Sequence, residues 1–282
     1  MQLREAVELA AARLGASPHP DRARRDAELL LIHLTGKSRA WLLAHADEEL
    51  GGCTAVRYAS LVERRLAGEP VQHITGEVEF FGLPFRVSRD VLIPRPETEH
   101  LVEAAINIVG GSEAATIVDV GTGSGAIAIA LANALKSSRI TATDLSAAAL
   151  AVARDNAQRN RVNVRFLQGD LLEPVAGEAF SLVVSNPPYV SATERPSLSI
   201  EVREYEPHLA LFAGPDGLDV YRRLIPQAFS RLCPGGHILF EIGYGQEKSV
   251  RALLEQNAFA DVRSLPDLLG IPRVLHATRG KD

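Results

Sequence analysis

Cysteine is scarce in this sequence, where only Cys53 and Cys233 occur among 282 residues. Two cysteines so far apart provide neither a disulfide framework nor the closely spaced pairs of a zinc site. The eight histidines do not cluster at metal-ligand spacing either. Low cysteine content is typical of a reducing compartment, so we expect a cytoplasmic protein that holds no metal ion.

Long apolar runs and an excess of positive charge are also absent. The first residues include Arg4, Glu5 and Glu8, where a signal peptide would need an apolar stretch, and no membrane segment follows. The formal net charge of −5 counts against an enzyme dedicated to nucleic acid, although a local basic face would escape such a sum. We therefore expect neither membrane attachment nor a nucleic-acid substrate.

What the sequence does contain is an ordinary globular composition, 46% hydrophobic and 23% charged, over a length sufficient for one large and one small domain. Residues 1–70 have helical periodicity, as in the stripe that includes Leu3 and Val7, and predict a small helical bundle. Such a bundle suits a stabilising cap and a partner-binding domain equally. Residues 71–93 alternate apolar side chains around Gly82 and predict a β-hairpin linker.

Residues 94–282 alternate strand and helix patterns, which is typical of a doubly wound α/β domain. Two prolines precede a helix that we expect to begin at about Glu97 and to end at Val109, since proline is favoured in the first helical turn. The polar stretch 191–208 predicts a lid or a substrate loop.

The most informative stretch follows the apolar run 180–185 and consists of Asn186, Pro187, Pro188 and Tyr189. The run is short and apolar, which predicts a buried parallel strand, and the two prolines end its hydrogen-bonded ladder. In open α/β sheets ligands bind just beyond the carboxyl ends of the strands, and each proline restricts the residue before it. The stretch therefore predicts a fixed pair of hydrogen-bond acceptors, with a plain turn as the alternative.

The chemistry that suits this stretch is methylation of a planar nitrogen. An amide or exocyclic amine nitrogen is a poor nucleophile because its lone pair is delocalised. Acceptors aimed at its two N–H bonds return electron density to it, and the side-chain oxygen of Asn186 and the main-chain oxygen of Pro187 suit that role. Tyr189 would pack as a flat wall against the planar group, with Pro188 completing the substrate-binding stretch.

A glycine-rich loop separates a predicted strand, residues 115–120, from a predicted helix, residues 126–132. The loop consists of Gly121, Thr122, Gly123, Ser124 and Gly125. Glycines let a ligand approach the main chain, and the helix amino terminus favours polar groups. The loop predicts a cofactor site, but its spacing also fits a dinucleotide fingerprint.

Three acidic residues at the ends of successive apolar strands favour S-adenosylmethionine as the ligand. Asp119 directly precedes the glycine loop and suits the methionine ammonium. Asp144 lies about 20 residues beyond the glycines, where a carboxylate accepts from both ribose hydroxyls. Asp170 suits the adenine amine, with Leu171 against the ring. Each acid alone is also explained as a strand-end cap, but three at successive repeats are not.

Residues 119–125, Asp144, Asp170 and 186–189 together resemble the motifs of class I S-adenosylmethionine-dependent methyltransferases acting on amide or exocyclic nitrogens. The segment 92–99 resembles that of the bacterial peptide chain release factor glutamine N5-methyltransferases, the PrmC or HemK family. The likeness runs nearly end to end. It implies a seven-stranded Rossmann-like domain with an antiparallel carboxyl-terminal hairpin.

The resemblance also implies the reaction and the partner. The methyl group of S-adenosylmethionine would pass to the glutamine of the Gly-Gly-Gln motif of class 1 release factors, gripped by the bundle of residues 1–70. Asn186 would also border the cofactor, and a monomer is expected. Arg95, Glu97 and Thr98 become further candidates, with helix capping as their competing role.

Other functions stay open at this point. The nearest are a glutamine methyltransferase of a ribosomal protein and an adenine-N6 methyltransferase of DNA or RNA, since the same tetrapeptide serves flipped adenines. The segment 93–99 favours the release-factor branch. A donor-binding adaptor without turnover and a nicotinamide enzyme are further alternatives. The intact stretch 186–189 argues against the adaptor, and the lack of a hydride-site constellation argues against the second.

Overall fold

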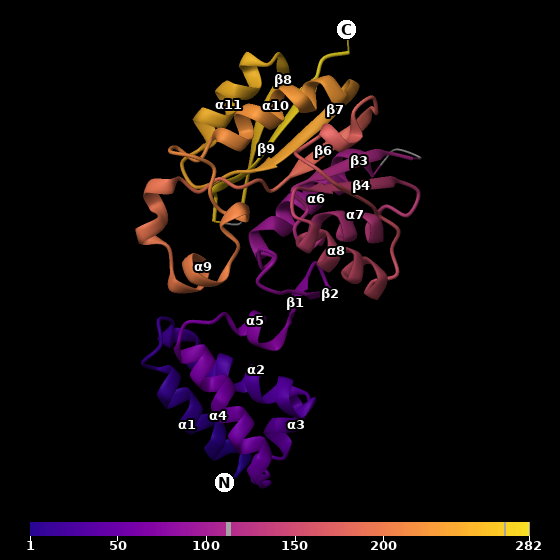
Figure 1. Cartoon of the computed structure of the whole chain (residues 1–282). Coiled ribbons are helices and arrows are strands. Elements are labelled where there is room, and N and C mark those ends of the chain that lie inside the picture. Colours follow the sequence, from indigo (N-terminus) through magenta and orange to yellow (C-terminus); the bar gives the residue numbers. More distant parts are fainter. Residues whose placement is uncertain (111–113, 268, 282) are drawn as a thin grey trace. The chain divides into compact units, whose positions relative to one another are not determined.

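The computed structural model describes residues 1–110, 114–267 and 269–281. The chain divides into two compact units. The amino-terminal unit contains residues 1–77 together with 198–205, and the larger unit contains residues 78–197 and 206–282. Figure 1 shows the first as a group of helices and the second as a sheet with helices on both faces.

The amino-terminal unit is helical, as its periodicity predicts. Its helices within residues 1–77 are α1 (Leu3–Leu14), α2 (Ala23–Thr35), α3 (Arg39–Ala44), α4 (Gly52–Leu66) and α5 (Val71–Thr75), with the 3-10 turn η1 (Pro20–Arg22) before α2. Their apolar stripes meet in one core that includes Val7, Leu30 and Tyr58. The buried Tyr58 hydroxyl has a hydrogen-bond partner inside this core, because it donates to the Ala27 carbonyl at 2.8 Å.

The stretch 191–208, expected to be a lid or substrate loop, contains two short helices. These are η4 (Ala192–Ser197) and α9 (Ile200–Tyr205), and the latter belongs to the amino-terminal unit. Arg65, which is only 1% exposed, joins α9 to the bundle because it donates to Glu201 at 2.6 Å and to Asp26 at 2.7 Å. Two acids around one buried guanidinium satisfy its charge without water.

The predicted hairpin linker of residues 71–93 differs from the structure at its start. Val71–Thr75 form helix α5, because Val71 and Ile74 lie three residues apart on one face and pack into the bundle core. Gly76, at φ 76°, then ends this helix in the left-handed conformation. The hairpin itself is β1 (Glu77–Phe80) and β2 (Leu83–Arg86).

The larger unit is built on a seven-stranded sheet with the order β5-β4-β3-β6-β7-β9-β8. The strands are β3 (Thr116–Val120), β4 (Arg139–Asp144), β5 (Arg165–Gln168), β6 (Phe180–Ser185), β7 (Leu232–Glu241), β8 (Phe259–Pro266) and β9 (Pro272–Arg279). The neighbouring strands β5, β4, β3, β6 and β7 run parallel, whereas β9 is antiparallel to both β7 and β8. This arrangement confirms the predicted doubly wound sheet with an antiparallel carboxyl-terminal hairpin.

Helices cover both faces of this sheet (Figure 1). They are α6 (Glu99–Val109), α7 (Ala126–Ala134), α8 (Ala147–Arg159), α10 (Asp219–Arg231) and α11 (Glu247–Gln256). Successive strand residues point to opposite faces, so Ile117 joins the core under α6 and α7 while Val118 joins the core under α10 and α11. No helix among the described residues is long and apolar enough to span a membrane.

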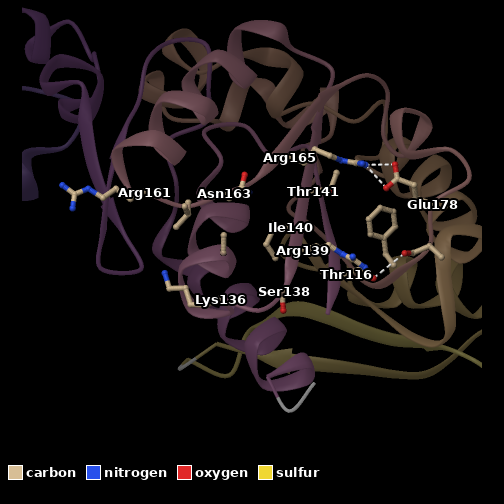
Figure 2. A pocket seen from close by; sticks show the side chains of 14 residues that line it. Thr116, Lys136, Ser138, Arg139, Ile140, Thr141, Arg161, Asn163, Arg165 and Glu178 are labelled. Carbon is tan, nitrogen blue, oxygen red and sulfur yellow. Dashed lines mark hydrogen bonds and ion pairs between the residues drawn. The ribbon is translucent and has the colours of Figure 1, made fainter. Parts of the chain in front are cut away.

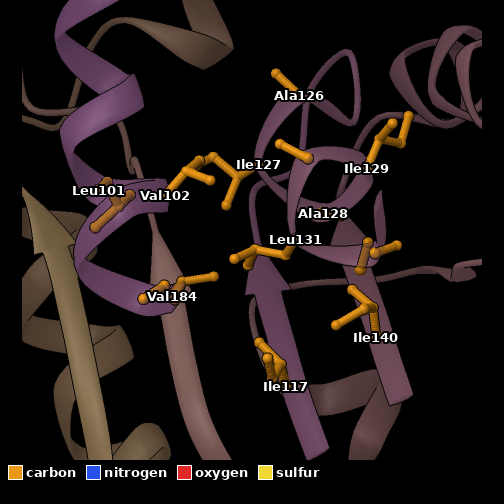
Figure 3. Packing of buried hydrophobic residues seen from close by; sticks show 14 of the residues in the cluster. Leu101, Val102, Ile117, Ala126, Ile127, Ala128, Ile129, Leu131, Ile140 and Val184 are labelled. Atoms are coloured by element: carbon orange, nitrogen blue, oxygen red, sulfur yellow. The ribbon is translucent and has the colours of Figure 1, made fainter. Parts of the chain in front are cut away.

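Helix α7 fixes the position of the glycine loop because it is buried nearly all round. Figure 3 shows Leu131 of this helix near Val184 of β6 and Ile117 of β3, and Ile127 near Val102 of α6. Fully burying one such side chain contributes roughly 1.5–3 kcal/mol relative to exposing it. The start of α7, and with it the preceding loop, is therefore held rigidly against the carboxyl ends of β3 and β6.

Candidate active site

The site lies where the direction of winding reverses. Strands β3 and β6 are neighbours, with Val118 beside Val183, and the chain winds from β3 toward β5 on one side and from β6 toward β8 on the other. Such a switch point leaves a crevice beyond the carboxyl ends of the two strands. A cavity of about 210 Å³, which we call the carboxyl-edge cavity, occupies this place.

Seven of the residues predicted from the sequence line the carboxyl-edge cavity. They are Gly121, Gly123, Asp144, Asp170, Leu171, Asn186 and Pro188. They come from four different strand ends, so the fold brings together residues that lie far apart in the sequence. The predicted cofactor residues and the predicted substrate residues thus share one cavity.

Two glycines of the loop expose their main chain to the cavity. Gly121 and Gly123 have φ values of 72° and 56°, a region that favours glycine. A Cβ atom built at either position would meet no atom within 4 Å, so the space beside the main chain is open to a ligand. Gly125 differs, because a Cβ there would lie 2.8 Å from Ile129 Cδ1. It is needed for close packing behind the loop.

Asp144 connects the glycine loop to the next helix. One of its carboxylate oxygens accepts from the Gly123 N–H at 2.8 Å and the other from the Ser146 N–H at 2.9 Å. Burial raises the pKa of this carboxyl, and the main-chain hydrogen bonds oppose that rise. Each oxygen keeps a further lone pair, so Asp144 can hold the loop and still accept from a ligand hydroxyl.

Asp170 and Leu171 border the same cavity from the end of β5. Asp170 forms an ion pair with Arg223, a residue of α10 that also lines the cavity. Leu171 has φ 49°, and its carbonyl accepts from the Thr143 hydroxyl at 2.8 Å. This bond fixes an unusual backbone conformation at a residue that lines the cavity.

Asp119 lies outside the cavity lining, and its expected contact with the methionine ammonium group stays a prediction. Its side chain is buried, where Oδ2 accepts from the Thr122 hydroxyl at 2.6 Å and from the Ala128 N–H at 3.2 Å, while Oδ1 has no hydrogen-bond partner among the described residues. Burial raises its pKa to about 7. Thr122, Ser124 and Gly125 also lie outside the lining, so these four residues shape the loop from behind. Strand-end position alone does not tell which way a side chain turns.

Asn186 belongs to a buried chain of hydrogen bonds. Its Nδ2 donates to Thr98 Oγ1 at 3.2 Å, and the Thr98 hydroxyl donates to Glu241 Oε2 at 2.6 Å. The Tyr189 hydroxyl donates to the other oxygen of Glu241 at 3.4 Å. Thr98 and Glu241 are only 4% and 3% exposed, so these contacts are shielded from water. The network connects Asn186 to Tyr189 through two residues outside their motif.

Pro187 and Tyr189 support the motif from outside the cavity lining. Pro187 is buried, and the Tyr189 carbonyl accepts from Gln246 Nε2 at 2.9 Å. A Cβ at Gly217 would lie 2.3 Å from that same carbonyl, which explains a glycine at a position with φ 75°. Burial raises the pKa of the Tyr189 hydroxyl, so it stays protonated at neutral pH.

The segment 94–99 holds the cavity wall through a second ion pair. Arg95 Nη2 donates to both carboxylate oxygens of Glu206, at 2.7 and 2.8 Å, and the Ile93 N–H donates to the same carboxylate at 3.4 Å. Glu206 directly precedes the stretch 207–212, part of which lines the cavity. The short turn η2 (Pro96–Thr98) places Thr98 at the start of α6, where its side chain reaches Asn186 instead of capping the helix.

Several lining residues were not singled out from the sequence: Val91, Leu209, Phe212 and Arg223. Leu209 is 56% exposed although it is apolar, and it borders the cavity. The sequence alone did not reveal it, because it follows a polar stretch without periodicity.

A larger cavity of about 760 Å³ opens at the opposite ends of the same strands, and we call it the amino-edge cavity. Figure 2 shows Lys136, Arg139 and Arg161 around it, and Arg165 paired with Glu178 at 2.6 Å. None of the motif residues lines it. Within the described residues no group of three or more histidines, cysteines or acids could hold a metal ion.

The switch-point cavity, the open glycine loop and the seven-stranded sheet together define a class I methyltransferase, a class that uses S-adenosylmethionine as its methyl donor. A methyltransferase structure from Pyrococcus furiosus has this fold, with a TM-score of 0.52 at 20% identity over 71% of this chain and 90% of that one. The family described as methyltransferase small domain matches residues 98–201, and that described as PrmC N-terminal domain matches residues 5–76.

The chain belongs to the family of release factor glutamine methyltransferases. The protein of that name from Koribacter versatilis is 42% identical over 276 residues, which is 98% of both chains. The one from Moorella thermoacetica is 44% identical over 285 residues and spans 100% of both. Such likeness covers the helical unit as well as the methyltransferase unit.

Proposed function

We propose that this protein methylates the side-chain amide nitrogen N5 of the glutamine in the Gly-Gly-Gln motif of class 1 peptide chain release factors. The family supplies the class of substrate, and the Asn186 network supplies the observation that carries the proposal. An amide side chain is held beside a ligand cavity, ready to pair with another amide.

The reaction requires that a carbon–sulfur bond breaks and a carbon–nitrogen bond forms, while the amide nitrogen gives up one proton. S-adenosylmethionine supplies the electrophilic methyl group and leaves as S-adenosylhomocysteine. Asn186 Oδ1 and the Pro187 main-chain oxygen accept from the two N–H bonds of the target amide, which returns electron density to its nitrogen. Alignment of the two reactants contributes roughly 7–11 kcal/mol in well-oriented reactions.

The donor site that fits this reaction is the glycine loop with its flanking acids. The main chain of Gly121 and Gly123 leaves room for the methionine portion, Asp144 accepts from the ribose hydroxyls, and Asp170 with Leu171 receives the adenine. Asp119 fixes the loop through Thr122 with one oxygen, and its unpartnered Oδ1 suits the methionine ammonium group. Tyr189 packs as a flat wall beside the target amide, with its hydroxyl fixed by Glu241.

The remaining parts of the chain take roles that follow from the substrate. Residues 1–70 form the domain that grips the release factor, residues 71–93 link it to the catalytic domain, and residues 94–282 carry the chemistry. We expect a monomer that acts in the cytoplasm, where release factors work, and that does not methylate nucleic acid.

The test offers several acceptors in one reaction. The protein is incubated with isotope-labelled S-adenosylmethionine, purified release factors, ribosomal proteins and nucleic acid, and the label is located by mass spectrometry. We expect label on the Gly-Gly-Gln glutamine. Label on a ribosomal-protein glutamine instead would show that the enzyme is a ribosomal-protein glutamine methyltransferase. Label in nucleic acid alone would overturn the proposal.

A further inference from the structure

The Asn186 side chain has two ends of similar shape but opposite chemistry. Its oxygen can accept from the N–H bonds of a target amide, whereas its NH₂ group would meet them donor against donor. Methyl transfer to an amide therefore requires that the oxygen end faces the acceptor. Something in the protein must decide between the two orientations.

The neighbouring residues contain a directional chain of hydrogen bonds. Ionised Glu241 can only accept, so the Thr98 hydroxyl must donate its single hydrogen to it at 2.6 Å. Thr98 Oγ1 then has only lone pairs left, and it can bind Asn186 only through Nδ2, as observed at 3.2 Å. Each hydrogen bond in this series therefore fixes which atom donates in the next one.

The fold brings these residues together through sheet register. Ser185 of β6 pairs with Phe240 of β7, so Asn186 and Glu241 follow side by side at the carboxyl edge. Thr98 enters from the turn before α6, 88 residues away from Asn186. All three are part of the same compact unit.

We propose that Thr98 and Glu241 are positioning residues which hold the Asn186 amide with Oδ1 toward the acceptor glutamine. The proposal rests on the proposed function, since it assigns the orientation needed for an amide substrate. Neither residue touches the reacting atoms. They act through Asn186, and a protonated Glu241 would release the constraint because it could then donate to Thr98.

The residues around Glu241 bring its ionisation into a pH range in which turnover can be measured. Burial and nearby Glu97 raise the pKa of Glu241, whereas the hydrogen bonds from Thr98 and Tyr189 and the charge of Arg273 lower it, and the net pKa is about 7. Tyr221 also packs here, with its hydroxyl donating to the Glu241 main-chain oxygen at 2.7 Å. Arg273 is itself paired with Asp267 at 3.2 Å, which limits its pull on Glu241.

The central test compares Thr98→Val with Thr98→Ser. Valine keeps the shape and loses the hydroxyl, and we expect a loss of about 10- to 100-fold in turnover with a donor Kd within about twofold of wild type. Serine keeps the hydroxyl and should restore turnover to within about threefold. Thr116→Val, at the amino end of β3, is the matched control for losing a threonine hydroxyl from the sheet, and we expect it to leave turnover unchanged.

The second arm records turnover at saturating substrates from pH 6 to 9. Wild-type turnover should rise as pH passes about 7, where Glu241 ionises. Glu241→Gln cannot ionise, so its turnover should be low and should lack this rise. This arm needs only the wild type and one conservative variant, and remains decisive if Thr98→Val folds poorly.

Turnover of Thr98→Val within about twofold of wild type would overturn the proposal, as would a loss explained by weaker donor binding. Wild-type turnover that does not rise near pH 7, or the same rise in Glu241→Gln, would contradict the positioning role proposed for Glu241. The proposed function fails separately, by label appearing on an acceptor other than the release-factor glutamine. The ratio between Thr98→Val and Thr98→Ser still tests the network on that acceptor.

Discussion

The carboxyl ends of the central strands, which we call the carboxyl edge, and their amino ends, the amino edge, differ in how their charged side chains are held. At the carboxyl edge, Asp119 and Glu241 are buried, and Asp144 is tied to main-chain N–H groups. At the amino edge, Lys136 and Arg161 are exposed around a cavity more than three times as large, about 760 against 210 Å³. Cavity size therefore does not mark the active site. What marks it is that residues of the cavity lining, such as Asp144 and Asn186, are held by fixed hydrogen-bond partners.

This difference predicts that substitutions at the carboxyl edge change function strongly and those at the amino edge hardly at all. Electrostatic preorganisation explains why: donors and acceptors already held in place need no reorganisation during reaction. Exposed side chains at the amino edge are solvated and free to move, so each contributes little.

The largest effect is expected for Asn186→Ala. Loss of one preorganised polar contact typically lowers turnover by about 10² to 10³, and we expect this loss with donor binding mostly intact. Steady-state kinetics with a release factor, together with calorimetric titration of the donor, measure both quantities. Turnover close to wild type would remove Asn186 from the proposed mechanism.

Asp144→Ala should weaken donor binding by about 10- to 100-fold. The substitution removes an acceptor for ribose hydroxyls and also the bond that holds the Gly123 N–H, and hydrogen bonds to charged groups contribute roughly 1.5–3 kcal/mol. Calorimetry with S-adenosylhomocysteine gives the affinity without turnover. Asp144→Asn, which retains one acceptor oxygen, is the matched control and should lose less. An unchanged affinity in the alanine variant would exclude Asp144 from the donor site.

Asp119→Asn tests the buried acid behind the loop. Since burial raises the pKa of Asp119 to about 7, the folded protein binds its proton more tightly than the unfolded chain. Its contribution to stability is complete below the unfolded pKa of about 4 and is lost as pH rises through about 7. The wild-type free energy of unfolding should therefore fall relative to the variant, by at most about 1.4 kcal/mol per pH unit.

Urea unfolding of both proteins from pH 5 to 8 measures this difference. Glu241, whose pKa is also raised to about 7, is present in both proteins, so its contribution cancels in the difference between their free energies of unfolding. A difference in the free energy of unfolding that stays constant across this range would show that Asp119 does not titrate as its burial implies.

The smallest effect is expected at the amino edge. Lys136→Ala removes an exposed cation of the amino-edge cavity and its hydrogen bond to Asn133. We expect turnover and donor affinity within about twofold of wild type, and a free energy of unfolding within about 0.5 kcal/mol. A large loss of activity would break the contrast between the two edges.

Much of the larger unit could be predicted from the sequence because its central strands are short, continuous apolar runs that end at polar residues. Strand β4 ends at Asp144 and β6 at Ser185, as their patterns indicate. Buried parallel strands and glycines at positive φ leave local signals that need no knowledge of distant residues. The motif residues of the carboxyl edge follow directly from those strand ends.

Contacts between distant segments could not be predicted. Glu241 lies 52 residues from its partner Tyr189, which the β6–β7 register brings close, and 143 from Thr98, which comes from the turn before α6. The burial of Asp119 depends on which way its side chain turns from β3. The place of α9 in the helical unit depends on buried Arg65, since the local sequence 200–205 has no pattern that favours either unit.

The most direct test of the account compares two acceptors with one enzyme. Label transfer from S-adenosylmethionine is measured for a class 1 release factor and for the same factor with its Gly-Gly-Gln glutamine replaced by alanine. We expect transfer to the first factor, localised to the glutamine side-chain nitrogen, and none to the second. Equal labelling of both factors, or methyl groups on any atom other than that nitrogen, would contradict it.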